Sequence, residues 1–284
     1  MKTHAVPLMD EQVLEAKGTH LTTRVQTKSS RTVVHRPIAS FDLESFADRY
    51  LPVRESANFR QRRNKIGHLW MAKLGVSLAY ESLLERSVLM DMDSDPTVSR
   101  VWTQPFRVDG LDENRGGRYV RPTPDILVEY DDGTLEVVEV KPEIAVHAPD
   151  PERYCDNLEA LDKAIGRWQR FQNTQNYLRS ELACLNMTVG VRSELSPARR
   201  HNLEYMSLYR RPFPKGDDLP GKVLEQAQKG PCEIVDLAER CDGFVSAMPV
   251  ILHLVWHREL EMNIEEPLNP TSIVHLPVSV SVAA

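Results

Sequence analysis

The sequence predicts a mixed α/β protein, with a larger domain built on a β-sheet and a smaller helical domain at the C-terminus. Short runs of aliphatic and β-branched residues alternate with longer segments in which apolar residues recur every three or four positions. Two of the short runs flank an acidic, glycine-containing turn, which is typical of a β-hairpin. The 284 residues, 41% of them hydrophobic, suffice for one large domain or two modest ones.

The first 40 residues show no clear periodicity and are rich in Thr, Ser, Arg and Val. We expect residues 1–40 to form an extended N-terminal arm that is disordered until a partner binds. A domain at residues 41–209 follows. In it, apolar residues on one face predict a helix over 81–92, which Ser82 can cap. Residues 98–108 predict an extended strand that Gln104-Pro105 interrupts.

A hairpin is predicted next, around an acidic turn. Ile126–Val128 and Leu135–Val138 are β-branched and aliphatic, as buried strands are, and Asp131-Asp132-Gly133 between them is a turn sequence. Ionised groups at the ends of such strands are costly unless a metal ion or a counter-charge compensates them. The polar residues that flank this hairpin are therefore candidates for a functional site.

The length of the turn decides which of these side chains face each other. A two-residue loop pairs Asp125 with Val140, whereas a three-residue loop with a left-handed Gly133 places Asp125 directly opposite Glu139. We expect the three-residue loop, which also puts Lys141 on the face of Glu139. Two opposed carboxylates repel each other unless a cation lies between them, and hard oxygen ligands suit Mg²⁺, with Mn²⁺ as a substitute. In the alternative, Asp125 only begins a turn, and Glu139 and Lys141 lie on an exposed edge strand.

The segments after the hairpin predict further elements of the sheet domain. Apolar residues recur at three and four positions from Leu158 to Phe171, which predicts a long helix that packs on the sheet. Residues 185–191 predict another strand. Ser196-Pro197 begins a helix that continues through Tyr209.

Residues 210–284 predict a winged helix-turn-helix domain. Its expected elements are helices at 220–228, 233–240 and 246–260 and wing strands at 262–264 and 272–276. The last helix takes the place of a recognition helix, yet it is apolar and offers only Arg258 as a strong cation, which favours protein binding over base readout. His253 and His257 could bind zinc, but no third ligand is evident, so we expect packing or hydrogen bonding there.

The order of a helix with a glutamate, a strand, a Pro-Asp hairpin, Glu-x-Lys and a long helix is that of the restriction-endonuclease-like, or PD-(D/E)xK, core. The sequence resembles the TnsA family in particular, from about residue 60 to the C-terminus. The residues that carry the resemblance are Ser82–Glu85, Val98, Gln104-Pro105, Thr123–Val128 and Glu139–Pro142. TnsA proteins are the endonuclease subunits of the heteromeric transposases of Tns-type bacterial cut-and-paste transposons.

This resemblance implies an activity and partners. Glu85, Asp125 and Lys141 take the catalytic positions of the family, and Glu139 takes the position before x-Lys. The implied reaction is hydrolysis of the non-transferred strand at the 5′ ends of a transposon, while a separate DDE transposase subunit, TnsB, cuts and joins the 3′ ends. The C-terminal domain is implied to engage the ATPase regulator TnsC.

The chemistry can be stated from the residues themselves. Glu85, Asp125 and Glu139, with the Val140 carbonyl, would hold one or two Mg²⁺ ions, which activate water and polarise the scissile phosphate. Lys141 would orient the attacking water or help to deprotonate it. The expected products are a 5′ phosphate and a 3′ hydroxyl. Two rivals remain, namely a stand-alone restriction or repair nuclease and a non-catalytic winged-helix adaptor.

Charge and composition limit the remaining possibilities. The net charge is −6, with +6 in residues 1–80 and −4 in residues 200–284. Since DNA affinity comes largely from neutralised phosphates, we expect weak binding to transposon-end DNA by the chain alone. The basic cluster at residues 60–65 is either a phosphate-facing patch or a solvated loop. The four cysteines form no C-x-x-C pair, and no apolar stretch approaches the roughly 20 residues of a membrane span. We expect a cytoplasmic protein without membrane contact.

Overall fold

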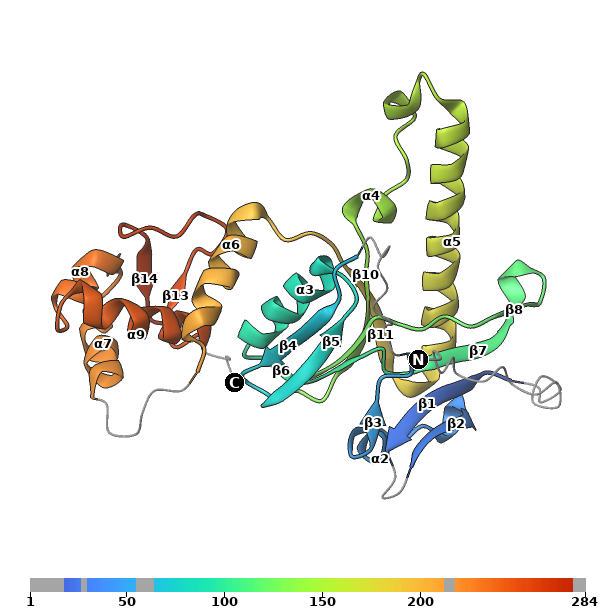
Figure 1. The fold of residues 1–284 in the computed structure, drawn as a ribbon, viewed down its shortest axis with the longest axis horizontal. Coiled ribbons are helices and arrows are strands. Elements are labelled where there is room, and N and C mark those ends of the chain that lie inside the picture. The colour runs from blue at the N-terminus through green and yellow to red at the C-terminus, as the bar shows by residue number, and fades with distance from the viewer. Residues whose placement is uncertain (1–17, 27–29, 55–63, 212–217, 278–284) are drawn as a thin grey trace, which may run out of the picture. The chain divides into compact units, whose positions relative to one another are not determined.

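The computed structural model describes residues 18–26, 30–54, 64–211 and 218–277 (Figure 1). Within these ranges the chain is a mixed α/β protein with eight α-helices and several small sheets. The chain divides into two compact units. The first unit comprises residues 1–68, 78–86 and 98–194, and the second comprises residues 69–77, 87–97 and 195–284.

One sheet of the first unit has the strand order β2-β1-β7-β8, with β3 paired to β1. Its strands are β1 His20–Gln26, β2 Arg31–Pro37, β3 Tyr50–Leu51, β7 Arg107–Asp112 and β8 Arg118–Val120. The expectation of an N-terminal arm without regular structure is wrong for the described residues within 1–40, because β1 pairs with both β2 and β7. Thr22 of β1 is fully buried and donates a hydrogen bond to Asp109 of β7, which fixes β1 in the sheet.

The other sheet of the first unit has the order β11-β10-β9-β6. Its strands are β6 Val98–Thr103, β9 Ile126–Tyr130, β10 Leu135–Val140 and β11 Met187–Arg192. The single strand expected at 98–108 is in fact divided between the two sheets as β6 and β7. The chain changes direction at Gln104, whose φ of 49° is left-handed, and Pro105 follows with no N–H to donate to a ladder.

The hairpin of β9 and β10 has the predicted register. Val138 pairs with Ile126 and Leu135 with Glu129, so that Asp125 and Glu139 occupy the next opposed positions. The turn is closed by a hydrogen bond from the Gly133 amide to the Tyr130 carbonyl, 3.0 Å long, and Gly133 has a φ of 81°. The prediction of a three-residue loop with a left-handed glycine is therefore confirmed.

The long helix α5 Leu158–Leu182 packs against β11 and exceeds its predicted length by about three turns (Figure 1). The Asn157 side chain caps its start by accepting a hydrogen bond from the Ala160 amide. The last turns enter the core of the first unit, where Leu178 and Leu182 are fully buried. This core also contains Leu21, Phe46, Trp102, Phe106, Val108, Leu127, Val137, Tyr177 and Met187. The unit also contains the short α-helices α2 Leu43–Ala47 and α4 Glu143–Val146, and short 3-10 helices such as Pro151–Tyr154.

The helix predicted at 81–92 is α3 Leu83–Ser94, and it follows a hairpin of β4 Gly67–Met71 and β5 Val76–Tyr80. Ser82 caps α3 as predicted, because its side-chain oxygen accepts a hydrogen bond from the Glu85 amide at 3.1 Å. Within α3, the residues up to Arg86 belong to the first unit and those from Ser87 onward to the second.

The second unit contains four more helices and a three-stranded sheet of order β12-β14-β13. Its elements are α6 Pro197–Met206, α7 Leu219–Ala227, β12 Cys232–Glu233, α8 Ile234–Glu239, α9 Phe244–Trp256, β13 Glu261–Met262 and β14 Ile273–His275. Helices α7, α8 and α9 and strands β13 and β14 come in the predicted order, and β12 is an additional strand. The boundary lies at Leu195 rather than 210, since Asn202 of α6 donates to the carbonyls of Ile264 and Glu266 at 2.9 and 2.7 Å.

Among the described residues, no helix is both long and apolar enough to cross a membrane.

Candidate active site

Three of the four predicted site residues meet at the end of the β9–β10 hairpin, in the first unit. Lys141 Nζ lies 2.7 Å from Asp125 Oδ2 and 2.8 Å from Glu139 Oε2. It also donates to the Val140 carbonyl at 3.2 Å, while the Val140 amide donates to Asp125 Oδ2 at 2.8 Å. The predicted register explains this arrangement, because it places both carboxylates on the face that Lys141 shares.

The ammonium group of Lys141 therefore lies where the sequence analysis expected a cation. All three oxygen donors predicted for a metal ion from this hairpin, on Asp125, Glu139 and Val140, are within 3.2 Å of that single positive charge. Glu139 is only 5% exposed and Lys141 is partly buried. Two ionised carboxylates buried side by side without a counter-charge would strongly destabilise the fold, and the positive charge of Lys141 between them reduces this cost.

Burial and charge shift the pKa values of this group in opposite directions. Burial, as the largest cause, and the charge of Asp125 raise the pKa of Glu139 to about 7, although Lys141 and Arg54 oppose this rise. Burial alone would lower the pKa of Lys141, but its contacts with Asp125 and Glu139 outweigh burial and raise that pKa. Lys141 is thus a fixed positive charge in this arrangement. Both roles that the sequence suggests for Lys141, orienting the attacking water or helping to deprotonate it, stay predictions for the metal-bound site.

Glu85, the fourth predicted residue, makes no hydrogen bond or ion pair to the other three in the described structure. Its carboxylate accepts hydrogen bonds from the Glu81 amide at 2.8 Å and the Ser82 hydroxyl at 3.1 Å, a variant of the helix capping box in which the amide before the N-cap residue is bound. Burial raises its pKa, and the negative charge of Asp125 adds to this rise, so the two carboxylates are close enough to interact. Glu85 consequently has a structural role as well as a place beside the site.

The structure adds two residues, Arg54 and Glu81, to which the sequence assigns no role at the site. Arg54, which follows the short strand β3, pairs with Glu81 at 2.7 Å between Nη2 and Oε2. Its charge also acts on Glu139. No local sequence pattern distinguishes Arg54, because its position depends on contacts with segments far along the chain. The cluster at residues 60–65 falls largely outside the described residues.

The donor set fits a hard divalent cation in its chemistry. Two carboxylates and a backbone carbonyl converge on one positive charge, and Glu85 supplies a third carboxylate nearby. Their present spacing is set by the lysine, and in the described part of the chain no group of three or more His, Cys, Asp or Glu side chains has the geometry of a metal site. Metal binding at these residues would require Lys141 Nζ to move aside.

The second unit shows that the predicted recognition helix is a core element. Helix α9 is almost entirely buried from Val250 to Trp256. This burial accounts for its apolar sequence, so the apolar side chains do not by themselves favour protein binding over base readout, and that preference stays a prediction. Arg258 donates to the Ser94 carbonyl at 3.4 Å. His253 and His257 donate to the carbonyls of Tyr209 and Arg210 at 2.7 and 3.1 Å, which confirms the expected hydrogen bonding.

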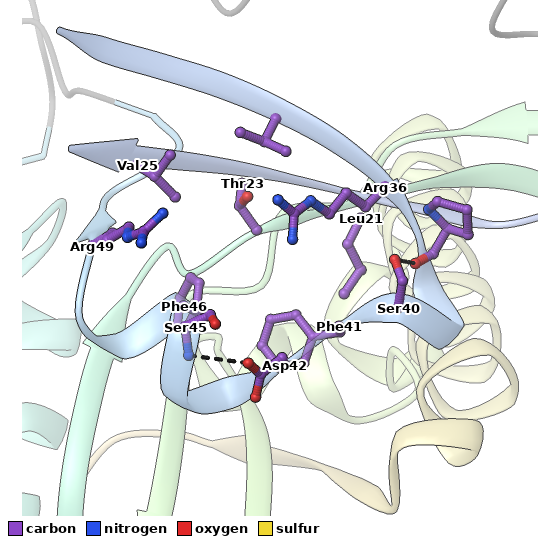
Figure 2. A pocket seen from close by; sticks show the side chains of 12 residues that line it. Leu21, Thr23, Val25, Arg36, Ser40, Phe41, Asp42, Ser45, Phe46 and Arg49 are labelled. Carbon is purple, nitrogen blue, oxygen red and sulfur yellow. Dashed lines mark hydrogen bonds between the residues drawn. The ribbon is translucent and has the colours of Figure 1, made fainter. Parts of the chain in front are cut away.

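A cavity of about 120 Å³ lies elsewhere in the first unit, between the β1–β2 hairpin and α2 (Figure 2). Leu21 and the rings of Phe41 and Phe46 form its apolar part, while Arg36 and Arg49 contribute positive charge. None of its lining residues belongs to the predicted site. We therefore treat the hairpin end, and not this cavity, as the candidate active site.

Comparison of the chain with protein-family models and with curated proteins gives no match.

Proposed function

We propose that this protein is a metal-dependent DNA endonuclease with a restriction-endonuclease-like core. The observation that carries the proposal is the convergence of Asp125, Glu139 and the Val140 carbonyl on Lys141 at the end of a hairpin whose register follows from its turn. A buried set of two carboxylates and one lysine does little for stability that an apolar set could not do. Its cost is explained if the same groups handle a metal ion and a phosphodiester.

In this proposal each residue has a defined task. Asp125, Glu139 and the Val140 carbonyl, with Glu85, hold Mg²⁺ or Mn²⁺, which supplies an activated water and a polarised scissile phosphate. Lys141 would leave these carboxylates to the metal ion, and it would orient the attacking water or place its positive charge against the charge that develops on the phosphate. Because the nucleophile is water, no covalent enzyme intermediate is formed, and the products are a 5′ phosphate and a 3′ hydroxyl.

We further propose the role that the resemblance to TnsA implies, namely cleavage of the non-transferred strand at the 5′ ends of a transposon. A DDE transposase subunit, TnsB, then cuts and joins the 3′ ends. The support is the agreement of the TnsA-like motifs with the structure. Thr123–Val128 leads into β9, Glu139–Pro142 ends β10, and Ser82–Glu85 begins α3.

For the second unit we propose a winged helix that binds the ATPase regulator TnsC. Helix α9 offers no row of cations for DNA, because it is buried and Arg258 is engaged with Ser94. The net charge of −4 in residues 200–284 also opposes phosphate contacts. With the apolar residues of α9 covered, a protein partner must meet other surface residues, among which Val245 at 88% exposure is the most open apolar side chain of α9.

A reconstituted cleavage assay tests this function. Transposon-end DNA labelled on each strand is incubated with Mg²⁺ and the wild-type protein, alone or together with the transposase and regulator subunits of the same element. We expect cleavage of the 5′ ends that depends on the partners and is lost in Asp125→Ala. Efficient cutting without partners would favour a stand-alone nuclease, and intact DNA under all conditions would favour a non-catalytic adaptor.

A further inference from the structure

Arg54 is an exposed cation at the rim of the candidate site, and its position is fixed from two sides. The Val53 amide donates to the Gln104 carbonyl at 3.0 Å, and the Gln104 amide donates to the Asp125 carbonyl at 2.7 Å. On the other side, the Arg54 guanidinium binds Glu81, whose amide donates to Glu85 at 2.8 Å. The backbone before Arg54 is thus linked through Gln104 to Asp125, and the Arg54 side chain is linked through Glu81 to Glu85.

The charge balance at this rim shows why a polyanion needs Arg54. Among the described residues, four carboxylates, on Glu81, Glu85, Asp125 and Glu139, and two cations, Lys141 and Arg54, interact at this site. Of these cations, Lys141 is 32% exposed and already engaged with two carboxylates, while Arg54 is 49% exposed. Its bond to Glu81 uses one terminal nitrogen. The planar guanidinium carries five N–H donors, which leaves donors for a phosphate in the paired geometry that arginine favours.

We propose that Arg54 binds a backbone phosphate of the DNA strand that enters the candidate site, and that Glu81 holds the guanidinium in position for this contact. The proposal rests on the proposed nuclease function and names a substrate-positioning residue for it. Arg54 contacts DNA without taking part in bond cleavage. Its charge offsets the repulsion between the phosphates and the carboxylates, and Glu81 orients the side chain before DNA arrives.

The test compares four variants of the full-length protein on transposon-end DNA, with the partner subunits present in every reaction. Affinity is measured in Ca²⁺ over a range of salt concentrations, and cleavage kinetics are measured in Mg²⁺. Arg54→Gln should weaken binding roughly tenfold, as expected for a lost charged hydrogen bond, and should reduce the salt slope by about 1. It should raise KM far more than it lowers kcat. Arg54→Lys should keep the salt slope and recover part of the affinity.

Two further variants separate this role from a structural one. Arg118→Gln removes an exposed arginine of β8 and should leave both affinity and kinetics unchanged. Glu81→Gln should keep the salt slope of the wild type, because the guanidinium remains free to reach the phosphate. An Arg54→Gln protein that matches Arg118→Gln in affinity and slope would overturn the proposal, and so would a fall in kcat at unchanged KM and affinity.

The outcomes also separate the proposed role of Arg54 from the proposed nuclease function. If Arg54→Gln binds and cleaves DNA as well as the wild type does, this inference is refuted and the nuclease function is left intact. A wild-type protein that binds DNA through Arg54 but never cuts would refute the nuclease function alone. A wild-type protein that neither binds nor cuts, with its partners present, would refute both.

Discussion

Replacement of Lys141 by methionine should lower the free energy of unfolding of the metal-free protein, and Mg²⁺ should restore much of the loss. Lys141 neutralises two carboxylates, at 2.7 Å from Asp125 and 2.8 Å from Glu139. Methionine keeps most of the side-chain volume but removes the charge and its hydrogen bonds. Asp125 and Glu139 then lack a counter-charge, so the folded protein must either hold two carboxylates in repulsion or protonate Glu139, whose pKa is already raised to about 7 with Lys141 in place.

The size of the effect follows from the burial of the three groups. Removal of one partner from a fully buried ion pair costs about 3–5 kcal/mol. The side chains of Asp125 and Glu139 are 12% and 7% exposed, but that of Lys141 is 32% exposed, so solvent screens part of the interaction. We therefore expect a loss of about 2–4 kcal/mol in the free energy of unfolding. In Mg²⁺ a divalent ion can take the place of the ammonium group, and much of this loss should be recovered.

Urea unfolding in EDTA and in Mg²⁺ measures this effect for the wild type and for Lys141→Met. The matched control is Lys163→Met, which removes an exposed lysine that pairs with Glu159 on the surface of α5 and should change stability little. If Lys141→Met is as stable in EDTA as the control, the two carboxylates do not depend on Lys141. If Mg²⁺ gives the variant no more stability than it gives the wild type, these oxygens are not the metal ligands.

Three further outcomes follow from individual contacts. Asp125→Asn should abolish cleavage yet change the metal-free free energy of unfolding by no more than about 1 kcal/mol, because an amide oxygen can still accept from the Val140 amide; a large loss in a melting experiment would mark the residue as structural. Burial, opposed in part by the hydrogen bond to Tyr209, lowers the pKa of His253 from 6.5, so the unfolded chain binds the proton more readily and stability should decline as pH falls below about 6.5. Unfolding curves of His253→Gln should lose that part of the pH dependence, and an unchanged profile would contradict this origin. Gly190→Ala should cost about 1–3 kcal/mol in thermal unfolding, since its Cβ would lie 1.9 Å from a Glu136 oxygen and this carboxylate can move only by giving up its bonds to Tyr130 and Arg192. Wild-type stability would contradict this close packing.

The hairpin could be predicted from sequence because local chemistry determines it. Asp131-Asp132-Gly133 favours a loop with a left-handed glycine, and this one choice sets the register of every later pair. The contacts among Asp125, Glu139 and Lys141 then follow from strand alternation. The capping of α3 by Ser82 was predictable for the same reason, since a cap is read from a few neighbouring residues.

Elements held by distant contacts were not predictable. Strand β1 has few apolar residues, and its place depends on Thr22 meeting Asp109, 87 positions later in the chain. Arg54 shows no motif of its own, and it reaches the site only through the contacts of Val53 and Glu81. The apolar sequence of α9 is equally compatible with a core helix and with a partner-binding surface, and only its burial decides between them.

The strand and the end chemistry of the cleaved DNA test the central claim most directly. Transposon-end duplexes labelled at either strand are cut in Mg²⁺ with all partner subunits present, and the product ends are identified by ligation and phosphatase treatment. We expect a break on the non-transferred strand with a 5′ phosphate and a 3′ hydroxyl. This break should be absent from Asp125→Asn and Lys141→Met reactions, in which joined 3′ ends should still form. Unchanged 5′ cleavage by both variants, or 5′ ends without phosphate, would contradict the central claim.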